Sequence, residues 1–353
     1  MPRVELELRA QPLAFMRWAA PLLALALTLV ICAPLLQAMG LEPLATYRIF
    51  LIEPLSTANG ISEWLLKASP LILIAVGLSI GFRANVWNIG AEGMFTMGAI
   101  AAVWLGLRVG AGHAWLLPAM LLAGALAGAA WAAIPAFLKT HANTSEILVS
   151  LMLNYVAALL LGFLVNGPMQ DPDGMNYPQS APLDPDAMLT PLFSGLRVNA
   201  SLGLTLLVVA AAGVFLARGF LGFQMRVTGD APAAARYAGF SEARVVWISL
   251  LLSGATAGLA GTLEAAGPLG QLSPSLSPGY GFAAIIVAFV GRLSPWGCVL
   301  GGLLLSLLYL GGEAVQMALN VPAALARGFQ GLLLFFLLAA DVLIVYRVRL
   351  RVR

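Results

Sequence analysis

The sequence predicts an all-α integral membrane protein that crosses the bilayer about ten times, with both termini in the cytoplasm. Three observations lead to this prediction. Of the 353 residues, 60% are hydrophobic and only 10% are charged, whereas soluble domains carry roughly 25% charged residues. The apolar residues form repeated runs close to the length that a transmembrane helix needs, about 20 residues. The cationic residues gather between these runs, mostly on one side.

Ten apolar runs follow one another along the chain. The first is expected to be an uncleaved anchor, because the arm before it, residues 1–17, contains two glutamates and the run exceeds the apolar core of a usual signal peptide. The eighth is too short for a full crossing, and we expect it to be re-entrant or tilted, with protein or water around its backbone. The predicted spans are 18–39, 65–82, 92–109, 115–138, 146–166, 200–217, 245–264, 281–291, 296–317 and 328–346.

The lysines and arginines orient this arrangement. Of the nineteen, fourteen lie on the side of the N-terminus and five on the other side. Cytoplasmic connections carry the excess of Lys and Arg in membrane proteins. We therefore expect both termini inside, and the spans together form a single transmembrane domain over residues 1–353.

The largest outer connection covers residues 167–199. It holds six prolines and four aspartates. Because proline removes a backbone donor, the segment is expected to be irregular or to carry only short helices. It is either a docking surface for an external partner or an ordinary connection whose acidic residues stay outside.

The cytoplasmic connection, residues 218–244, predicts a short surface helix at its centre. Gly229 precedes that helix, Asp230 can cap it, and Pro232 falls in its first turn. A capped helix offered to the cytosol indicates docking of a partner. The alternative for Arg236 and Tyr237 is that they anchor the loop to the lipid headgroups. The residues assigned to the docking element are Gly229, Asp230, Ala233, Arg236, Tyr237 and Gly239.

Catalysis by this chain is not expected. A phosphate-binding loop needs Gly-Lys-Ser/Thr, and the two lysines, Lys67 and Lys139, each follow a leucine. The two cysteines and two histidines are far apart in sequence, so we expect no disulfide framework and no metal site. The chain is predicted to be a transport subunit and not an enzyme.

Two further patterns concern the membrane domain. The pairs Gly124-x-x-x-Gly128 and Gly254-x-x-x-Gly258 predict close helix packing. Residues 85–93, NVWNIGAEG, interrupt an apolar stretch with two asparagines and two glycines. Transporters expose backbone groups to substrate at such breaks. Glu92 therefore borders a substrate, or it stabilises the N-terminus of the following helix near the interface.

Three stretches together are similar to a known family. They are NVWNIGAEGMFTMGA (85–99), TSEILVSLMLNYVA (144–157) and RVTGDAPAAARYAGF (226–240). They resemble permease subunits of bacterial ABC importers, in the nucleoside-type branch of the superfamily that also holds permeases for ribose, other simple sugars and branched-chain amino acids. The similarity runs from about residue 65 to the C-terminus. The chain departs from the family pattern at Met94, where glutamine is frequent, and at Ala231, where asparagine is frequent.

The resemblance implies an importer and a set of partners. The expected cargo is a nucleoside, with a simple sugar such as ribose or branched-chain amino acids as alternatives. The expected partners are a separate ATPase subunit that binds ATP and Mg, a second and usually different permease chain, a substrate-binding lipoprotein or periplasmic protein, and membrane lipid. No nucleic acid and no cofactor on this chain are implied. The location is the bacterial plasma (inner) membrane, and residues 226–240 supply the coupling helix.

Nucleosides are neutral and combine a flat base with a polar ribose, so their path should mix aromatic surfaces with amide-type hydrogen-bonding groups. The candidates for this path are Trp87, Asn88, Glu92, Phe95, Asn154 and Tyr155. Core packing is the ordinary alternative for such residues. The rival hypothesis from another class is an ion-coupled secondary transporter, in which Glu92 or Glu313 would relay protons.

Overall fold

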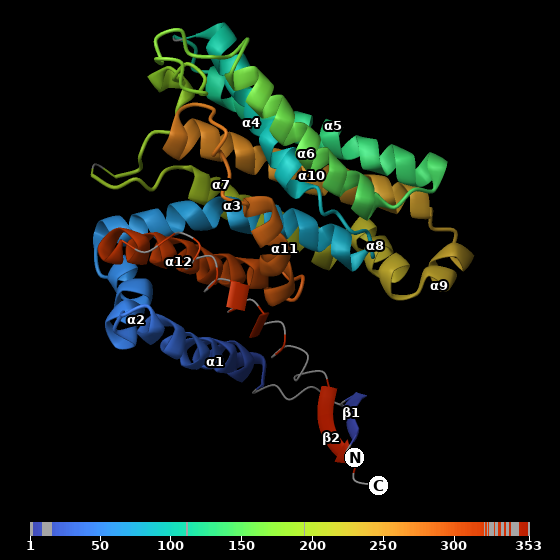
Figure 1. The fold of residues 1–353 in the computed structure, drawn as a ribbon. Helices are drawn as coiled ribbons and strands as arrows, with labels where there is room; N and C mark the ends of the chain where they lie inside the picture. Colours follow the sequence, from blue (N-terminus) through green and yellow to red (C-terminus); the bar gives the residue numbers. More distant parts are fainter. Residues whose placement is uncertain are drawn as a thin grey trace. The chain divides into compact units, whose positions relative to one another are not determined.

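The computed structural model describes residues 3–8, 16–110, 112–193, 195–320 and 346–351, together with scattered positions between 322 and 339. The described residues are mostly helical (Figure 1). The chain divides into two compact units, Met1–Ile61 with Leu307–Arg353 and Ser62–Ser306. The division falls within two helices, α3 (Ala58–Arg83) and α12 (Pro295–Leu319).

The first unit contains α1 (Met16–Ala38), α2 (Pro43–Leu51) and the 3₁₀ turn η1 (Glu53–Leu55). It also holds one short antiparallel pair, β1 (Arg3–Leu8) with β2 (Tyr346–Arg351). The register sets Glu5 opposite Arg349 and Glu7 opposite Arg347. Apolar and charged residues alternate in both segments, which is the period of a strand. Apart from this pair, the regular elements of the described residues are helices, as predicted.

The second unit holds the remaining helices. Besides most of α3 and the first part of α12, it contains one turn of 3₁₀ helix, one turn of π-helix and eight α-helices among the described residues. They are α4 (Ala91–Val109), α5 (Leu116–Ala142), α6 (Glu146–Val165), η2 (Pro185–Ala187), α7 (Ser201–Arg218), α8 (Phe220–Asp230), α9 (Pro232–Tyr237), α10 (Glu242–Glu264), the π turn η3 (Ala265–Leu269) and α11 (Tyr280–Val290).

Seven helices of the described part are long and apolar enough to cross a membrane: α3, α4, α5, α6, α7, α10 with its continuation η3, and α12. The chain is thus a multi-pass membrane protein. The described apolar part of α1, Ala26–Ala38, and α11 are shorter. The 11 residues of α11 confirm that the eighth predicted run is too short for an ordinary span. The tenth predicted span, 328–346, lies mostly outside the described residues, so the count of ten and the sidedness stay predictions.

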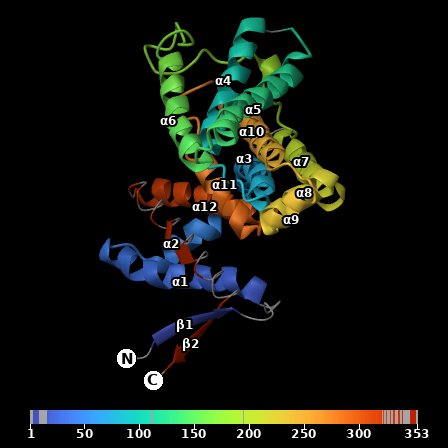
Figure 2. The same ribbon diagram turned by 90° about the vertical axis from the view of Figure 1, so that its right-hand side faces the viewer.

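Glycines bring α4, α5 and α10 into close contact (Figure 2). A Cβ atom added to Gly98 would lie 2.2 Å from the carbonyl oxygen of Gly258. One added to Gly128 would lie 2.2 Å from the carbonyl oxygen of Gly254. Since no side chain fits at these distances, the glycine pairs on α5 and α10 allow direct backbone contact. The packing predicted from the Gly-x-x-x-Gly spacing is confirmed here.

The long connection 167–199 is irregular, as its prolines predict, with η2 as a short helical turn. It is nevertheless tied to the segment after α10. The amide of Ser180 donates to the carbonyl of Leu272 at 2.9 Å, and the amide of Leu183 donates to the carbonyl of Gly270 at 2.8 Å. The backbone amides of this irregular segment thus find their hydrogen-bond acceptors in a segment distant in sequence.

Candidate functional site

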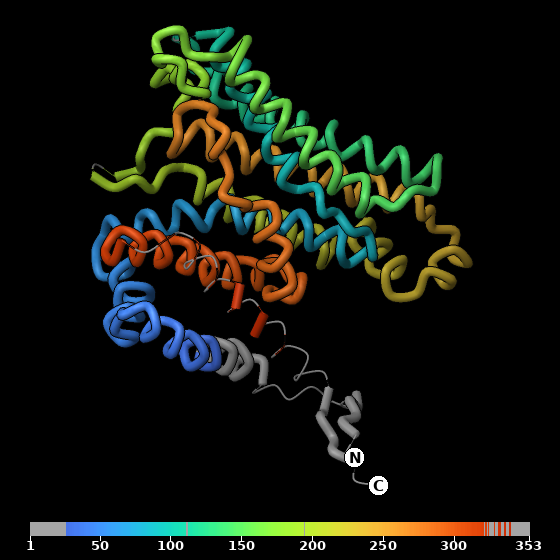
Figure 3. Tube along the Cα trace, in the orientation of Figure 1, coloured from blue at the N-terminus to red at the C-terminus, as the bar shows by residue number. Residues whose placement is uncertain are grey.

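The predicted cytoplasmic connection folds into two helices, α8 and α9, and then turns into α10 (Figure 3). The predicted short helix is present as α9. The longer α8 is absent from the sequence-based prediction, because Gly222 and Gly229 favour a loop in the residues that it occupies. Both glycines are needed for packing. A Cβ atom on Gly229 would lie 2.0 Å from the carbonyl oxygen of Arg83.

The start of α9 corrects one part of the prediction. Gly229 and Asp230 belong to the last turn of α8, and Ala231 occupies the cap position of α9 without a side-chain bond. The amide of Ala231 donates to the carbonyl of Val227 at 2.9 Å. Asp230 therefore has helical backbone within α8 and does not cap α9. Pro232 lies in the first turn of α9, as predicted.

The end of α9 follows helix-termination chemistry. Gly239 has φ of +79°, a left-handed conformation that glycine adopts at low cost. The amide of Phe240 donates to the carbonyl of Ala235 at 3.0 Å. The ring of Phe240 meets the edges of Phe220 and Phe223 on α8 at centroid distances of 6.1 and 6.3 Å. This aromatic cluster holds α9 against α8, since six residues alone are too few for a stable helix.

Apart from Ala235, the residues of α9 are exposed. Ala235 is buried, whereas Ala233 is exposed and Tyr237 is 97% exposed. Arg236 is exposed as well, and its Nη2 lies 3.1 Å from Oε2 of Glu242 at the start of α10. The outer face of α9 thus exposes an entire tyrosine ring and a guanidinium group whose one ion pair among the described residues is with Glu242.

The second predicted region is the break between α3 and α4. Asn85, in the turn that follows α3, has the left-handed conformation, with φ of 57°. The following backbone is held by α6. The amide of Ile89 donates to Oγ of Ser150 at 3.2 Å, and the amide of Trp87 donates to Oε1 of Glu146 at 3.4 Å. The broken backbone predicted from NVWNIGAEG is present.

Two asparagines of the predicted path lie inside this break. Asn88 is 1% exposed. Its Nδ2 donates to Oγ of Ser253 on α10 at 2.7 Å, and its Oδ1 accepts from the amide of Gly90 at 2.9 Å. Asn154 on α6 accepts from the amide of Gly93 at 2.8 Å and donates to the carbonyl of Ile89 at 3.0 Å. Both amides satisfy backbone groups that the break leaves without helical partners.

Glu92 joins α4 to another helix. Its Oε2 accepts from the amide of Gly281, in the first turn of α11, at 2.6 Å. The sequence left open whether Glu92 borders a substrate or stabilises the N-terminus of its own helix; the structure places Glu92 in the first turn of α4, and its side chain bonds to the first turn of α11. Phe95, one turn further along α4, is fully buried, and its ring meets the edge of Tyr280 at a centroid distance of 6.1 Å. Together Glu92 and Phe95 fix α11 beside α4.

The last two path candidates differ in exposure. Trp87 is half-buried; its ring stacks on Phe289 at a centroid distance of 5.8 Å and meets Phe82 in a tilted contact at 5.1 Å. Tyr155 is 63% exposed, although its neighbour on α6, Asn154, is buried. The structure therefore gathers Trp87, Asn88, Glu92, Phe95 and Asn154 around the start of α4 and leaves Tyr155 apart. A solute can reach Asn88 or Phe95 only after the surrounding helices move.

Several contributors to this region were missed from the sequence. Ser150 and Ser253 bond the break from α6 and α10, and single serines in apolar helices carry no distinctive pattern. Glu146 pairs with Lys139 across the turn between α5 and α6, at 2.6 Å. Because these two opposite charges flank the same predicted turn, the sequence contained enough information to predict the pair.

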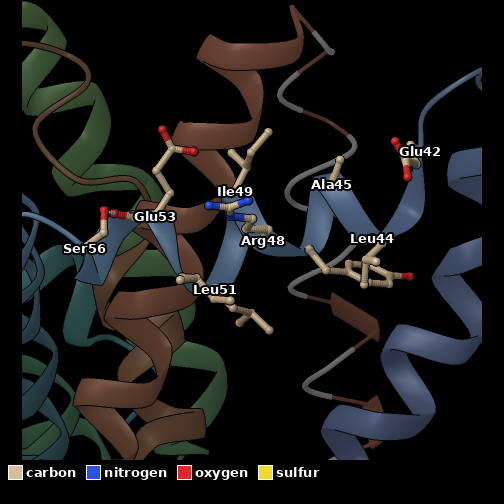
Figure 4. Close-up of a pocket in the computed structure, with 10 residues that line it drawn as sticks. Glu42, Leu44, Ala45, Arg48, Ile49, Leu51, Glu53 and Ser56 are labelled. Atoms are coloured by element: carbon tan, nitrogen blue, oxygen red, sulfur yellow. Dashed lines mark hydrogen bonds between the residues drawn. The ribbon is translucent and has the colours of Figure 1, made fainter.

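A separate cavity lies in the first unit. It measures about 840 Å³ and is lined by α2, η1 and the residues beside them, including Glu42, Arg48 and Glu53 (Figure 4). Helix α2 itself was not predicted, since its nine residues fall in the polar connection between the first two apolar runs. None of the predicted site residues lines this cavity.

Comparison with known proteins shows the family. A family described as "Branched-chain amino acid transport system / permease component" matches residues 60–338. The glucose ABC transporter permease protein TsgB13 of Haloferax volcanii is 38% identical over 98% of this chain and 94% of its own length. The nucleoside ABC transporter permease protein NupB of Lactococcus lactis is 29% identical over 90% of this chain and 89% of its own. The guanosine ABC transporter permease protein NupP of Bacillus subtilis is 29% identical over 86% and 88%.

A second nucleoside permease protein of Lactococcus lactis, NupC, is 26% identical over 72% of this chain and 83% of its own length. No solved structure matches the chain. The family match covers most of the sequence, and the relatives align over nearly their full lengths. The chain belongs to this permease family and is the permease subunit of an ABC transporter.

Proposed function

We propose that this chain forms one half of the translocation path of an ATP-driven importer in the inner membrane and couples to a separate ATPase through α9. The observation that carries this proposal is the exposure of α9. Tyr237 is 97% exposed on a helix of six residues, next to Arg236 and Ala233. Tyrosine and arginine are enriched among the residues that dominate protein interfaces. An ATPase that docks here would bind ATP and Mg, while this chain needs no cofactor or metal of its own.

The docked helix explains how ATP energy would reach the membrane domain. The aromatic cluster of Phe220, Phe223 and Phe240 fixes α9 on α8. The end of α8 is in turn packed against the carbonyl of Arg83 through Gly229. A displacement of α9 would therefore also displace α8 and the cytoplasmic end of α3. Closing of the ATPase dimer would move these helices together and switch the path between its two accessible states.

Two further partners complete the proposed importer. Two relatives from Lactococcus lactis, NupB and NupC, are both nucleoside ABC transporter permease proteins. Such a pair supports a second, different permease chain beside this one. A substrate-binding lipoprotein or periplasmic protein would deliver the solute to the outer side, where the connection 167–199 lies under the predicted topology.

For the cargo, we propose a neutral solute that contains a sugar ring. The 38% identical relative is a glucose permease protein, and the 29% identical relatives are nucleoside and guanosine permease proteins. A monosaccharide is therefore the first candidate and a nucleoside the second. The polar groups of the described membrane helices agree with a neutral cargo, because Asn88, Asn154 and Ser253 offer hydrogen bonds without charge. Tyr155 offers an exposed ring for stacking on a sugar or base.

Uptake assays decide between the two kinds of cargo. The chain is expressed with its ATPase, second permease and binding protein in cells that lack their own uptake systems, and labelled glucose is supplied. We expect uptake that unlabelled glucose blocks and that guanosine and leucine leave unchanged. If labelled guanosine enters and glucose does not compete, nucleosides are the cargo. Uptake of labelled leucine alone would contradict the sugar-ring proposal.

A further inference from the structure

Three arginines line a surface cavity at the C-terminal end of α8. The cavity measures about 430 Å³ and lies wholly within the second unit. Its cationic lining comes from three different places in the chain: Arg83 ends α3, Arg226 lies on α8, and Arg292 lies in the turn between α11 and α12. One acidic residue, Asp230, also lines it. The charged lining therefore carries a formal excess of two positive charges.

The two best-defined guanidinium groups are oriented by backbone carbonyls. Nε of Arg83 donates to the carbonyl of Leu293 at 2.8 Å, and Nη2 of Arg226 donates to the carbonyl of Leu216 at 3.2 Å. A guanidinium group has five N–H donors, so each retains donors for a ligand. Within the described part of the chain, neither forms a salt bridge with Asp230 or with another acid. Both guanidinium groups therefore lack a directly paired carboxylate among the described residues, although Asp230 lines the same cavity.

The walls of the cavity are fixed rather than loose. Gly229 packs directly on the carbonyl of Arg83, which joins the end of α8 to the end of α3. Phe82, which also lines the cavity, stacks on Phe289 at a centroid distance of 5.4 Å, and this contact joins α3 to α11. The arginines consequently lie on elements whose mutual positions are set by packing, which is what a built binding site requires.

The depth of the cavity indicates the ligand. Arg83 is the last residue of a membrane-spanning helix, and Arg292 lies three residues before α12, another such helix. These positions correspond to the headgroup layer of the bilayer, whichever side of the membrane they face. Basic pockets between transmembrane helices at this depth bind phosphate-bearing headgroups. Arginine suits phosphate because its planar fork can form two parallel hydrogen bonds with it.

We propose that this cavity binds the phosphate group of an anionic phospholipid, with Arg83, Arg226 and Arg292 as the cationic contacts. The acyl chains would lie along the apolar surface beside the cavity. Bound there, the lipid would join α3, α8 and the α11–α12 turn next to α9. The proposal does not depend on the ATPase contact or on the identity of the cargo.

Lipid retention tests the proposal on the full chain. The protein is purified in mild detergent, titrated with phosphatidylglycerol, and examined by native mass spectrometry, with phosphatidylcholine as the zwitterionic reference. The test variant is Arg226→Gln with Arg292→Gln, two exposed side chains whose loss should leave the fold intact. The matched control is Arg218→Gln with Arg244→Gln, two arginines of the same connection that do not line the cavity.

We expect tight binding of one phosphatidylglycerol to the wild type and to the control. The test variant should bind it about 25-fold more weakly, because each cationic side chain near an anionic headgroup contributes roughly 1 kcal/mol and about 1.4 kcal/mol corresponds to a factor of ten. Competition by inorganic phosphate without retention of phosphatidylglycerol would show a free-phosphate site and overturn the lipid assignment. Equal retention by test and control variants would overturn the proposal. It would also fail if the test variant kept the lipid but lost a copurifying ATPase, since the occupant would then be an acidic group of that protein.

Discussion

Tyr237 and Arg236 are the residues on which the proposed contact with the ATPase depends. Tyr237 makes almost no contact within its own chain, at 97% exposure, and Arg236 has one exposed ion pair with Glu242. An exposed pair contributes about 0–1 kcal/mol to stability. The fold should therefore tolerate changes at both positions, whereas a docked partner should not.

We predict that Tyr237→Ala weakens the ATPase contact roughly 30-fold, since truncation of a dominant interface residue costs about 2 kcal/mol or more. Arg236→Glu should abolish copurification of the ATPase or its stimulation by cargo, because it replaces a cation with an anion on the outer face of α9. The matched control is Tyr177→Ala, a 67% exposed tyrosine in the connection 167–199. If both α9 variants insert normally and keep coupled ATP hydrolysis, α9 is not the docking element. Arg236 and Tyr237 would then anchor the connection to the lipid headgroups.

Substitutions of Glu92 distinguish a structural role of its side chain from a role in proton transfer. Its Oε2 accepts from the amide of Gly281 at 2.6 Å, and the side-chain amide oxygen of glutamine can accept the same bond. We predict that Glu92→Gln leaves uptake largely intact. Glu92→Ala should lower the free energy of unfolding by about 1–3 kcal/mol, because it leaves the amide of Gly281 without its acceptor. Thermal unfolding and uptake are measured for both. Loss of uptake in a stably inserted Glu92→Gln protein would indicate that the carboxylate itself is required.

At the residue scale, the sequence identified the polar break and the short helix α9 but not the partners of their side chains. Asn88 and Asn154 stand out because asparagine is rare in apolar stretches, and both lie in the break. That Asn88 bonds to Ser253, 165 positions away, depends on how α10 packs, and no local pattern encodes it. Asp230 was assigned to the wrong helix end for a similar reason, since the contact of Gly229 with Arg83 lets α8 continue through Asp230.

At the element scale, close backbone contact among α4, α5 and α10 holds the described membrane helices of the second unit together. The hydrophobic effect contributes little between helices in lipid, so packing of small residues takes its place. The spacing of glycines on α5 and α10 made this contact predictable. The partner of each glycine pair was not predictable, because many glycines of the chain share the same spacing.

We predict that Gly128→Ala destabilises the protein by roughly 1–3 kcal/mol, the usual cost of overpacking, because the new Cβ would meet the backbone of α10 at 2.2 Å. The matched control is Gly162→Ala on α6, where a Cβ would have no neighbour within 4 Å. That change should be neutral or stabilising by up to ~1 kcal/mol, since alanine favours helix over glycine. Thermal unfolding in detergent compares the two. Equal midpoints for both variants would contradict the close approach of α5 and α10.

The short helices are the elements that were hardest to predict from the sequence. α11 was expected to be short because its apolar run is short, and it is. α2 and α8 were missed because their sequences mix apolar residues with charges and glycines, so neither gives a clear helical period. Such helices form because neighbouring elements pack on them, as Phe240 does on α8, and this information is not local.

At the scale of the whole molecule, the distribution of cationic residues predicts that both termini face the cytoplasm. The antiparallel pairing of β1 with β2 supports this proposal, because paired strands must lie on the same side of a membrane. We predict that reporter proteins fused to either end are active only as cytoplasmic reporters. The same reporter placed in the connection 167–199 provides the opposite control. A periplasmic signal from the C-terminal fusion would overturn the even number of spans.

Family membership was recognisable from three stretches of the sequence, and it decides against an ion-coupled secondary transporter as the class of this protein. The cargo was less predictable. Nucleoside-type motifs led to a nucleoside, whereas a glucose permease protein shares 38% identity with the chain. These motifs lie at the α3–α4 break, on α6 and on α8 and α9, where they stabilise the fold and its proposed docking surface, so they carry little information about which solute passes.

Dependence of uptake on the ATPase tests the central proposal most directly. The permease pair is reconstituted in proteoliposomes with its binding protein, and entry of labelled solute is measured with and without the ATPase, with ATP and Mg inside or outside the vesicles, and with the proton gradient collapsed. We predict uptake only when the ATPase and ATP are present on the side of α9, with no effect of the proton gradient. Uptake by the permease chains alone, driven by a proton gradient and lost in Glu92→Gln, would contradict the account.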